Sequence, residues 1–443
     1  MTNPYYLFFL LVAGIAFIVW FTAFKKVNAF FTLLIAALGV GILSGLPLGE
    51  IVTALKMGFG HTMEKIGLLI ILGTTLGVIL EKTGATMSMA NFILTRVKEK
   101  NAAMAISITG FIIGMPIFCD SGFIILSGLN HSLVKKTHYK MPVMATALAT
   151  SLLSVHCLVP PHPGITAAVG TVGGDMGMVM LWGIMLAVPS AIVGYFWSVW
   201  RGSRVSYECL ETETIQVVVK QLPNAGISFL PVILPIFLIA GKSLLLLNLG
   251  EKDSIFIQLI SFIGEPVIAL SIGIIVSFLL IQKTTIKDLS HWLADGVEKA
   301  GMILAIIAAG GMFGEMLQSS GMGKNLGTIM SGLSLGIFFP FIVTAILKTA
   351  QGSSTVAVIT ASSLVTPLLA DLGIHNPMGI TFTILSMGAG SMIVSHANDA
   401  YFWVISRFSN METAATLKVY TVSTFFMGLT VQLLIWVLFI ILA

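Results

Sequence analysis

Thr349-Ala350-Gln351-Gly352-Ser353-Ser354-Thr355-Val356-Ala357 is a short polar stretch between two apolar runs. It places an amide, a glycine and three hydroxyls close together, and Lys348 stands directly before it. Irregular polar backbone is tolerated at membrane depth only where it is buried in protein or lines a wet cavity. The stretch therefore predicts a break between two half-helices that contributes to a ligand site.

An earlier stretch, Phe118-Cys119-Asp120-Ser121-Gly122-Phe123, has the same character. Each polar stretch interrupts an apolar segment, 101–134 for the earlier one and 334–370 for the later one. We interpret both segments as re-entrant hairpins. Discontinuous helices of this kind meet near the bilayer midplane in secondary transporters.

The composition places the chain in a lipid bilayer. Of its 443 residues, 56% are hydrophobic and 9% are charged, against about 25% charged in an average soluble domain. The net charge of +4 is typical of Lys and Arg in cytoplasmic loops, so we expect no nucleic-acid partner. The three cysteines lack metal-ligand spacing, and no Walker A motif is present. We therefore expect no cofactor or metal, and no direct drive by ATP.

Apolar runs of about 17 to 25 residues are candidate membrane spans. We predict ten, at 5–23, 28–47, 66–81, 141–160, 178–199, 226–247, 257–281, 301–317, 378–406 and 424–442.

The Lys and Arg residues indicate the orientation of these spans, because they collect in short cytoplasmic loops. With both termini outside, only Lys56, Lys65, Lys252 and Lys324 fall in outer loops. In this arrangement hairpin 101–134 enters from the cytoplasm and hairpin 334–370 opens outward.

An internal repeat divides the chain. The segment 73–84 matches 310–321 at an offset of 237, with glycines shared at three positions. Five crossings per half would make the halves inverted. We predict an all-α polytopic protein with a first repeat at 1–205, a cytoplasmic linker at 206–225 and a second repeat at 226–443.

Asp120 is the first candidate for chemistry, because an ionised carboxylate in an apolar segment is costly and is usually functional. It is a candidate proton carrier. The structural alternative is that Asp120 caps the second arm of its hairpin. Gly122 would permit a tight turn there.

The half-helix that begins near Gly352 has unsatisfied N–H groups and a positive dipole end, which favour an anion. Lys348 would add a positive charge, although a membrane lysine also extends to the interface. Ser353, Ser354 and Thr355 are either ligand-binding hydroxyls or small residues at a helix contact.

Two histidines lie at corresponding helix breaks. His156 precedes three prolines in a broken helix at 141–175, and His396 lies in a broken helix at 378–406. Each histidine either fixes the unwound backbone or acts in the site. Asp399, close to His396, is a second buried carboxylate that could exchange a proton.

These motifs resemble the GntP family of gluconate permeases, within the ion transporter superfamily, over essentially the whole chain. The matching segments are 116–123, 156–164, 351–357, 395–399 and 402–403. The resemblance implies bacterial proton symporters of gluconate and related sugar acids, with some members that carry D-serine or other hydroxy acids. Ser121, Ser354 and Lys348 depart from the family pattern, which affects the expected substrate more than the transport function.

We therefore expect a multi-pass inner-membrane transporter that takes up a small hydroxylated carboxylate together with protons. The expected substrate-binding residues are Ser121, Gly122, His156, Lys348, Gly352, Ser353, Ser354, Thr355 and Asn398. The expected proton-coupling residues are Asp120, His396 and Asp399.

Three alternatives stay open at this point. They are a sodium-coupled mono- or dicarboxylate transporter, a D-serine or hydroxy acid permease of the same family, and an intramembrane hydrolase that uses a serine with His156 or His396. The oligomeric state is also open, with a homodimer as one candidate.

Overall fold

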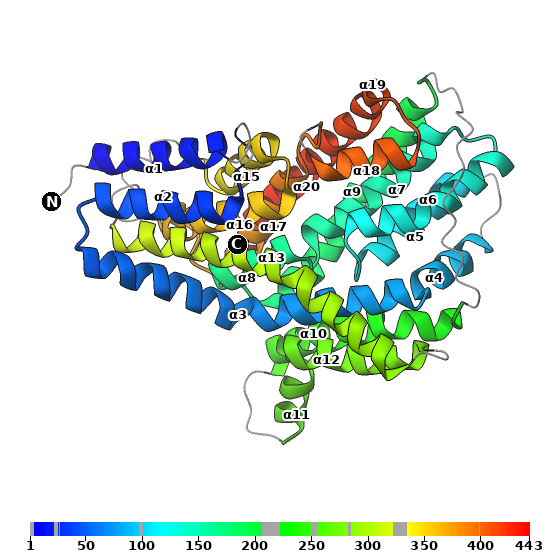
Figure 1. Cartoon of the computed structure of the whole chain (residues 1–443), viewed down its shortest axis with the longest axis horizontal. Coiled ribbons are helices and arrows are strands. Elements are labelled where there is room, and N and C mark those ends of the chain that lie inside the picture. The colour runs from blue at the N-terminus through cyan, green and yellow to red at the C-terminus, as the bar shows by residue number, and fades with distance from the viewer. Residues whose placement is uncertain are drawn as a thin grey trace.

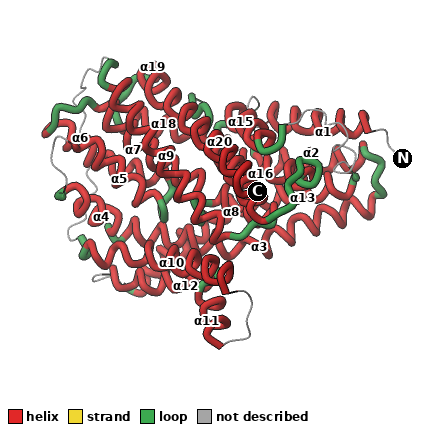
Figure 2. The backbone as a smooth tube through the Cα atoms, turned by 180° about the vertical axis from the view of Figure 1, so that it is seen from behind, coloured by secondary structure: helices red, strands yellow, loops and turns green. Residues whose placement is uncertain are grey.

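The computed structural model is helical throughout the part of the chain that it describes (Figure 2). The all-α prediction is confirmed. The described residues are 4–21, 25, 27–96, 101–205, 222–249, 255–281, 285–321, 335–397 and 399–443.

Figure 1 shows the helices coloured in chain order, from blue at the N-terminus to red at the C-terminus. In the first half they are α1 Pro4–Val19, α2 Ala29–Leu43, α3 Leu48–Lys82, α4 Ala85–Leu94, α5 Ala102–Gly114, α6 Cys119–Lys136, α7 Met141–Leu158, α8 Pro163–Val172 and α9 Met176–Gly202. In the second half they are α10 Ala225–Leu249, α11 Ile255–Ile263, α12 Pro266–Ser277, α13 Ile286–Ser319, α15 Phe338–Gln351, α16 Ser354–Val365, α17 Pro377–Met392, α18 Ala400–Phe408, α19 Thr413–Thr416 and α20 Val422–Leu442.

Six helical segments of the described chain are long and apolar enough to cross a membrane, against ten predicted spans. A seventh is counted if α11 and α12, bent by 65° at their junction, form one span. The helices α1 and α2 are apolar but have only 16 and 15 residues, fewer than the roughly 20 that a bilayer requires. The helix α11 projects from the rest of the chain in both views (Figures 1 and 2).

The two longest helices, α3 and α13, pack against each other in antiparallel directions. A Cβ on Gly58 would collide with the backbone of Gly311, and a Cβ on Gly296 would lie 2.6 Å from Thr75 Cα. Both helices extend well before the predicted spans at 66–81 and 301–317, because the prediction followed only their apolar parts. Glycines at these crossings let the backbones approach closely.

The repeated glycines bring these long helices against the interrupted segments. A Cβ on Gly77 would lie 2.8 Å from the Pro116 carbonyl oxygen, next to the α5–α6 break. A Cβ on Gly314, its partner in the sequence repeat, would lie 3.2 Å from Ser363 Cβ on α16. The inverted relation of the halves stays a prediction.

Four helical segments are interrupted at the polar motifs. The breaks separate α5 from α6, α7 from α8, α15 from α16, and α17 from α18. The proposed division at 206–225 stays a prediction, since residues 206–221 lie outside the described chain.

Candidate functional site

The interrupted segments enclose a cavity of about 370 Å³. It is lined by Phe118, Cys119, Asp120, Leu153, His156, Met302, Ile303, Ile306, Gln351, Gly352, Ser353, Ser354, Thr355, Val356, Ile359, Asp399, Ala400 and Tyr401. Polar backbone of the breaks forms part of this wall, and apolar side chains of α13 form another part. The volume lies within the range of small-molecule sites, about 300 to 1,000 Å³.

Three helix N-termini reach the cavity wall, those of α6, α16 and α18. Ser353 caps α16 by accepting a hydrogen bond from the Val356 N–H at 3.3 Å, and Asp399 caps α18 by accepting from the Tyr401 N–H at 3.0 Å. Phe118 precedes α6 and provides no side-chain cap. The first N–H groups of a helix and its dipole give this end a partial positive charge. The cavity is therefore suited to an anionic group.

The break between α15 and α16 depends on Gly352, which has a φ of 83°. This left-handed conformation is readily available only to glycine. It lets the chain leave α15 and start α16 after a single further residue, Ser353. The Lys348 ammonium donates to the Gly352 carbonyl oxygen at 2.7 Å and so satisfies an acceptor that the break exposes.

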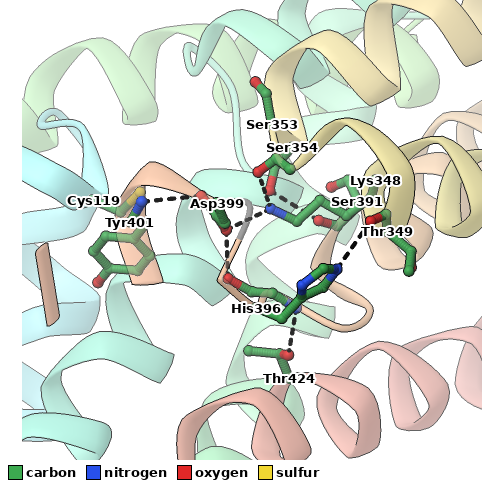
Figure 3. A network of polar contacts seen from close by, with 12 residues as sticks. Cys119, Lys348, Thr349, Ser353, Ser354, Ser391, His396, Asp399, Tyr401 and Thr424 are labelled. Atoms are coloured by element: carbon green, nitrogen blue, oxygen red, sulfur yellow. Dashed lines mark hydrogen bonds and ion pairs between the residues drawn. The ribbon is translucent and has the colours of Figure 1, made fainter. Parts of the chain in front are cut away.

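Lys348 also forms a buried ion pair with Asp399 (Figure 3). Its Nζ lies 2.6 Å from Asp399 Oδ2, and the Lys348 side chain is fully buried. Asp399 additionally accepts a hydrogen bond from the Ser395 hydroxyl. The pair joins the second hairpin to the break between α17 and α18.

Two further hydrogen bonds connect the same elements. His396 Nε2 donates to the Thr349 carbonyl oxygen at 3.0 Å (Figure 3). The Ser354 hydroxyl donates to the Ser391 carbonyl oxygen at 2.9 Å. Carbonyl groups near helix ends lack partners within their own helix, and these side chains provide them.

The first half has a matching contact. His162 Nε2 donates to the carbonyl oxygen of Gly114, the last residue of α5, at 2.7 Å. The sequence motifs place His156 in the position that corresponds to His396. In the structure, however, His162 makes the contact that corresponds to that of His396, because each bonds a carbonyl oxygen at the end of the first helix of a hairpin. His156 instead lines the cavity, with its Nδ1 at 3.3 Å from His162 Nδ1.

Asp120 and Asp399 both line the cavity but have different surroundings. Within the described chain, Asp120 has one long contact, from Cys119 Sγ at 4.0 Å, whereas Asp399 has Lys348, Ser395 and Tyr401. Asp120 is the second residue of α6 and is not its N-cap, so the capping alternative lacks the expected hydrogen bond.

Gln351 is a cavity residue that the sequence analysis did not include among the site residues. Its amide oxygen and nitrogen are both buried and have no hydrogen-bond partner among the described residues. Buried polar groups are nearly always paired, so the Gln351 amide is open to a partner such as water or a ligand. The available signal was its place beside Gly352 in the polar motif.

The other predicted residues divide into two groups. His156, Gly352, Ser353, Ser354, Thr355, Asp120 and Asp399 line the cavity. Ser121, Gly122, Lys348 and His396 are not among the lining residues, and Asn398 lies outside the described chain. Gly122 packs on α7, where a Cβ would lie 2.9 Å from Leu152 Cδ2. Among the described residues, no group of histidine, cysteine or acidic side chains is arranged to hold a metal ion.

Comparison with known proteins shows what the chain is similar to. The family model described as GntP family permease matches residues 6–441. A gluconate permease of Pseudomonas aeruginosa is 31% identical over 430 residues, covering 95% of this chain and 94% of the relative. The D-serine transporter DsdX of Escherichia coli is 29% identical over 408 residues, covering 90% of this chain and 91% of the relative.

A solved structure shares the fold. The YdaH transporter of Alcanivorax borkumensis superposes with a TM-score of 0.64 at 12% sequence identity, covering 96% of this chain and 98% of that one.

Proposed function

The chain belongs to the GntP family of permeases, and from this membership we propose that it imports gluconate or a related small hydroxylated carboxylate together with protons. It would do so as a multi-pass protein of the inner membrane. The observation that carries the proposal is the cavity, on which three helix N-termini, an unpaired amide and a carboxylate converge. Because the family consists of permeases, the hydrolase alternative is set aside.

The substrate carboxylate would bind at the helix N-termini. The α6 terminus has no side-chain cap, so its first N–H groups are available to a ligand. Ser353, Ser354 and Thr355, at the start of α16, border the same cavity. Anions bind readily at helix N-termini because N–H donors and the dipole act together.

Lys348 would contribute less directly than a free cation. A lysine ammonium has three donors, and Asp399 and Gly352 occupy two of them. Direct contact with the substrate therefore requires the third donor or the opening of the Asp399 pair. The predicted contact between Lys348 and the substrate carboxylate stays a prediction.

The hydroxyl groups of the substrate would bind Gln351, Ser353, Ser354 and Thr355. The Gln351 amide offers a donor and an acceptor, both without a protein partner in the described chain. Ser354 already donates to the Ser391 carbonyl oxygen, so its hydroxyl is available to the substrate as an acceptor. Ser121, Gly122 and Asn398 stay predicted contacts.

Asp120 would carry the coupled proton. Asp399 is already paired with an ammonium, a hydroxyl and an N–H donor. Asp120 has none of these partners and borders the same cavity. We therefore assign proton uptake to Asp120 ahead of Asp399 and His396.

Purified protein in proteoliposomes tests the function. The liposomes would be supplied with D-gluconate, D-serine or a dicarboxylate under an imposed pH gradient or sodium gradient. We expect gluconate to accumulate under the pH gradient, and collapse of that gradient with an uncoupler to abolish accumulation. Accumulation that follows only the sodium gradient would refute proton coupling, and uptake of D-serine alone would reassign the substrate.

A further inference from the structure

We propose that His156 presents a fixed hydrogen-bond acceptor, its Nε2 atom, to the cavity, and that His162 holds it in this state. The acceptor would recognise a hydroxyl hydrogen of the substrate. This inference rests on the proposed function. It adds that a substrate hydroxyl is recognised by His156 Nε2, and that His162 fixes the tautomer of His156.

The first step concerns His162. Its Nε2 lies 2.7 Å from the Gly114 carbonyl oxygen, which can only accept a hydrogen bond. The Nε2 atom therefore carries a hydrogen. The same contact satisfies the last carbonyl of α5, which has no partner within its helix.

The second step concerns the charge of His162. This side chain is buried, with 4% of its surface exposed. No carboxylate of the described chain lies within ion-pair distance of either histidine ring. An unpaired buried cation is strongly disfavoured, so the ring is neutral and its Nδ1 is an acceptor.

The third step derives the tautomer of His156 from that of His162. The two Nδ1 atoms are 3.3 Å apart, and only one of them can hold a hydrogen between them. Because His162 Nδ1 accepts, His156 Nδ1 must donate. The other nitrogen of a neutral ring is then an acceptor, so His156 Nε2 has a lone pair and no hydrogen.

His156 Nε2 has no protein partner within the described chain, and the residue forms part of the cavity wall. A ligand that lies against it must supply a donor. A hydroxyl meets this requirement, and a carboxylate is repelled. The helix N-termini favour an acceptor such as a carboxylate, whereas His156 Nε2 requires a donor. A hydroxy acid would therefore bind with its carboxylate away from His156.

This arrangement predicts discrimination against deoxy acids. A site built to pair a substrate hydroxyl rejects the analogue that lacks it, because the buried group is left unpaired. We expect the monodeoxy analogue that lacks the paired hydroxyl to bind about tenfold to hundredfold more weakly than the parent acid.

Equilibrium binding of D-gluconate and its five monodeoxy analogues to the purified full-length protein tests the recognition. In the wild type, one analogue should bind at least about tenfold more weakly than gluconate. In His156→Phe, which keeps an aromatic ring without the acceptor, this difference should disappear. Equal losses for gluconate and all analogues in His156→Phe would overturn the proposal.

The matched control is His131→Phe. Like His162, His131 bonds a backbone carbonyl through its Nε2, that of Phe408 at 2.9 Å. His131 does not line the cavity. This variant should keep the wild-type ranking of the analogues. A changed ranking in His131→Phe would show that the ranking responds to structural damage, and it would also overturn the assignment to His156.

The tautomers can be measured without any ligand. Carbon and nitrogen chemical shifts of labelled histidine in lipid-embedded protein distinguish the Nδ1–H form from the Nε2–H form. We expect a neutral Nδ1–H signal that disappears in His156→Phe and changes to the Nε2–H form in His162→Phe. An Nε2–H or charged His156 would overturn the proposal. Since this spectrum needs no substrate, it decides the tautomer even if gluconate uptake fails and the proposed function is wrong.

Discussion

Replacing Lys348 with methionine tests whether the buried ion pair holds the second hairpin to the α17–α18 break. Methionine keeps an unbranched chain that fills a similar space but removes the ammonium. The substitution leaves Asp399 as a buried carboxylate with the Ser395 hydroxyl and the Tyr401 N–H as its remaining donors. It also removes the partner of the Gly352 carbonyl oxygen.

The contacts that Lys348 makes determine how much its loss should lower the free energy of unfolding. Removal of one member of a buried ion pair typically costs about 3 to 5 kcal/mol, because the other charge stays in a medium of low polarity. Asp399 keeps two donors, which favours the lower end, and the lost bond to Gly352 adds about 1 kcal/mol. We therefore expect Lys348→Met to lower the free energy of unfolding by about 4 kcal/mol.

A second ion pair provides the matched control. Lys242 and Glu265 have the same 2.6 Å separation between nitrogen and oxygen, but their side chains are 22% and 51% exposed. An exposed pair contributes about 0 to 1 kcal/mol, so Lys242→Met should have a small effect. Because the two pairs have the same separation, the difference between the variants measures the effect of burial.

Equilibrium unfolding in mixed detergent micelles would compare these two variants with Asp399→Asn and with the double variant Lys348→Met/Asp399→Asn. The double variant should be more stable than Lys348→Met alone, because the unpaired charge has been removed, with a coupling energy above about 1 kcal/mol. If Lys348→Met were no less stable than Lys242→Met, or if the double variant lost the sum of both single effects, the ion pair would not have the assigned role.

Three further predictions concern transport, recognition and topology. Asp120→Asn should abolish gluconate accumulation driven by a pH gradient but keep exchange across the membrane; retained accumulation would move the proton to Asp399. Gln351→Leu should weaken gluconate binding about tenfold in a titration, since the leucine cannot pair substrate hydroxyls; an affinity within twofold of wild type would refute this contact. Cysteines at positions 138 and 203 should react with an impermeant thiol reagent only after permeabilisation. The Lys140 ammonium donates to the Ser203 carbonyl oxygen at 3.2 Å, so the two loops lie together, and both loops are basic. Labelling in intact cells would contradict the proposed orientation.

The sequence located the breaks well because breaks have local causes. Gly352 is followed by hydroxyl residues inside an apolar run, and Pro160, Pro161 and Pro163 follow His156. A glycine followed by capping hydroxyls, or several prolines close together, favours the end of a helix, whereas single prolines such as Pro189 lie inside a continuous helix. The same local reasoning selected Asp120 as a candidate site residue, and Asp120 lines the cavity; its role stays a prediction.

Partners across the fold were harder to predict. Lys348 and Asp399 are separated by 51 positions, and no local pattern shows that they pair. No local pattern assigns a contact to His162, since its bond to Gly114 depends on how the α7–α8 break packs against the first hairpin. Gln351 was not chosen because an unpaired amide becomes visible only when every neighbour is placed.

The predicted bounds of the spans at 66–81 and 301–317 differ from the helices for another reason. Hydropathy measures apolar length, but α3 continues through Lys56 and Lys65 as one helix of 35 residues. Helix length depends on where capping residues and breaks occur as well as on apolar character. The start of α13 illustrates this, because Thr285 and Asp288 form a reciprocal capping box before the apolar part begins.

The histidine contacts across the breaks also constrain the order of biosynthesis. The Gly114 carbonyl obtains its partner from a residue 48 positions later, and the Thr349 carbonyl from one 47 positions later. A ribosome adds about 5 to 20 residues per second, so each of these carbonyl groups is made about 2 to 10 seconds before its histidine. An unsatisfied backbone group in lipid costs several kcal/mol. Each newly made hairpin must therefore wait in contact with water, or with the insertion machinery, until the broken helix of its own half arrives.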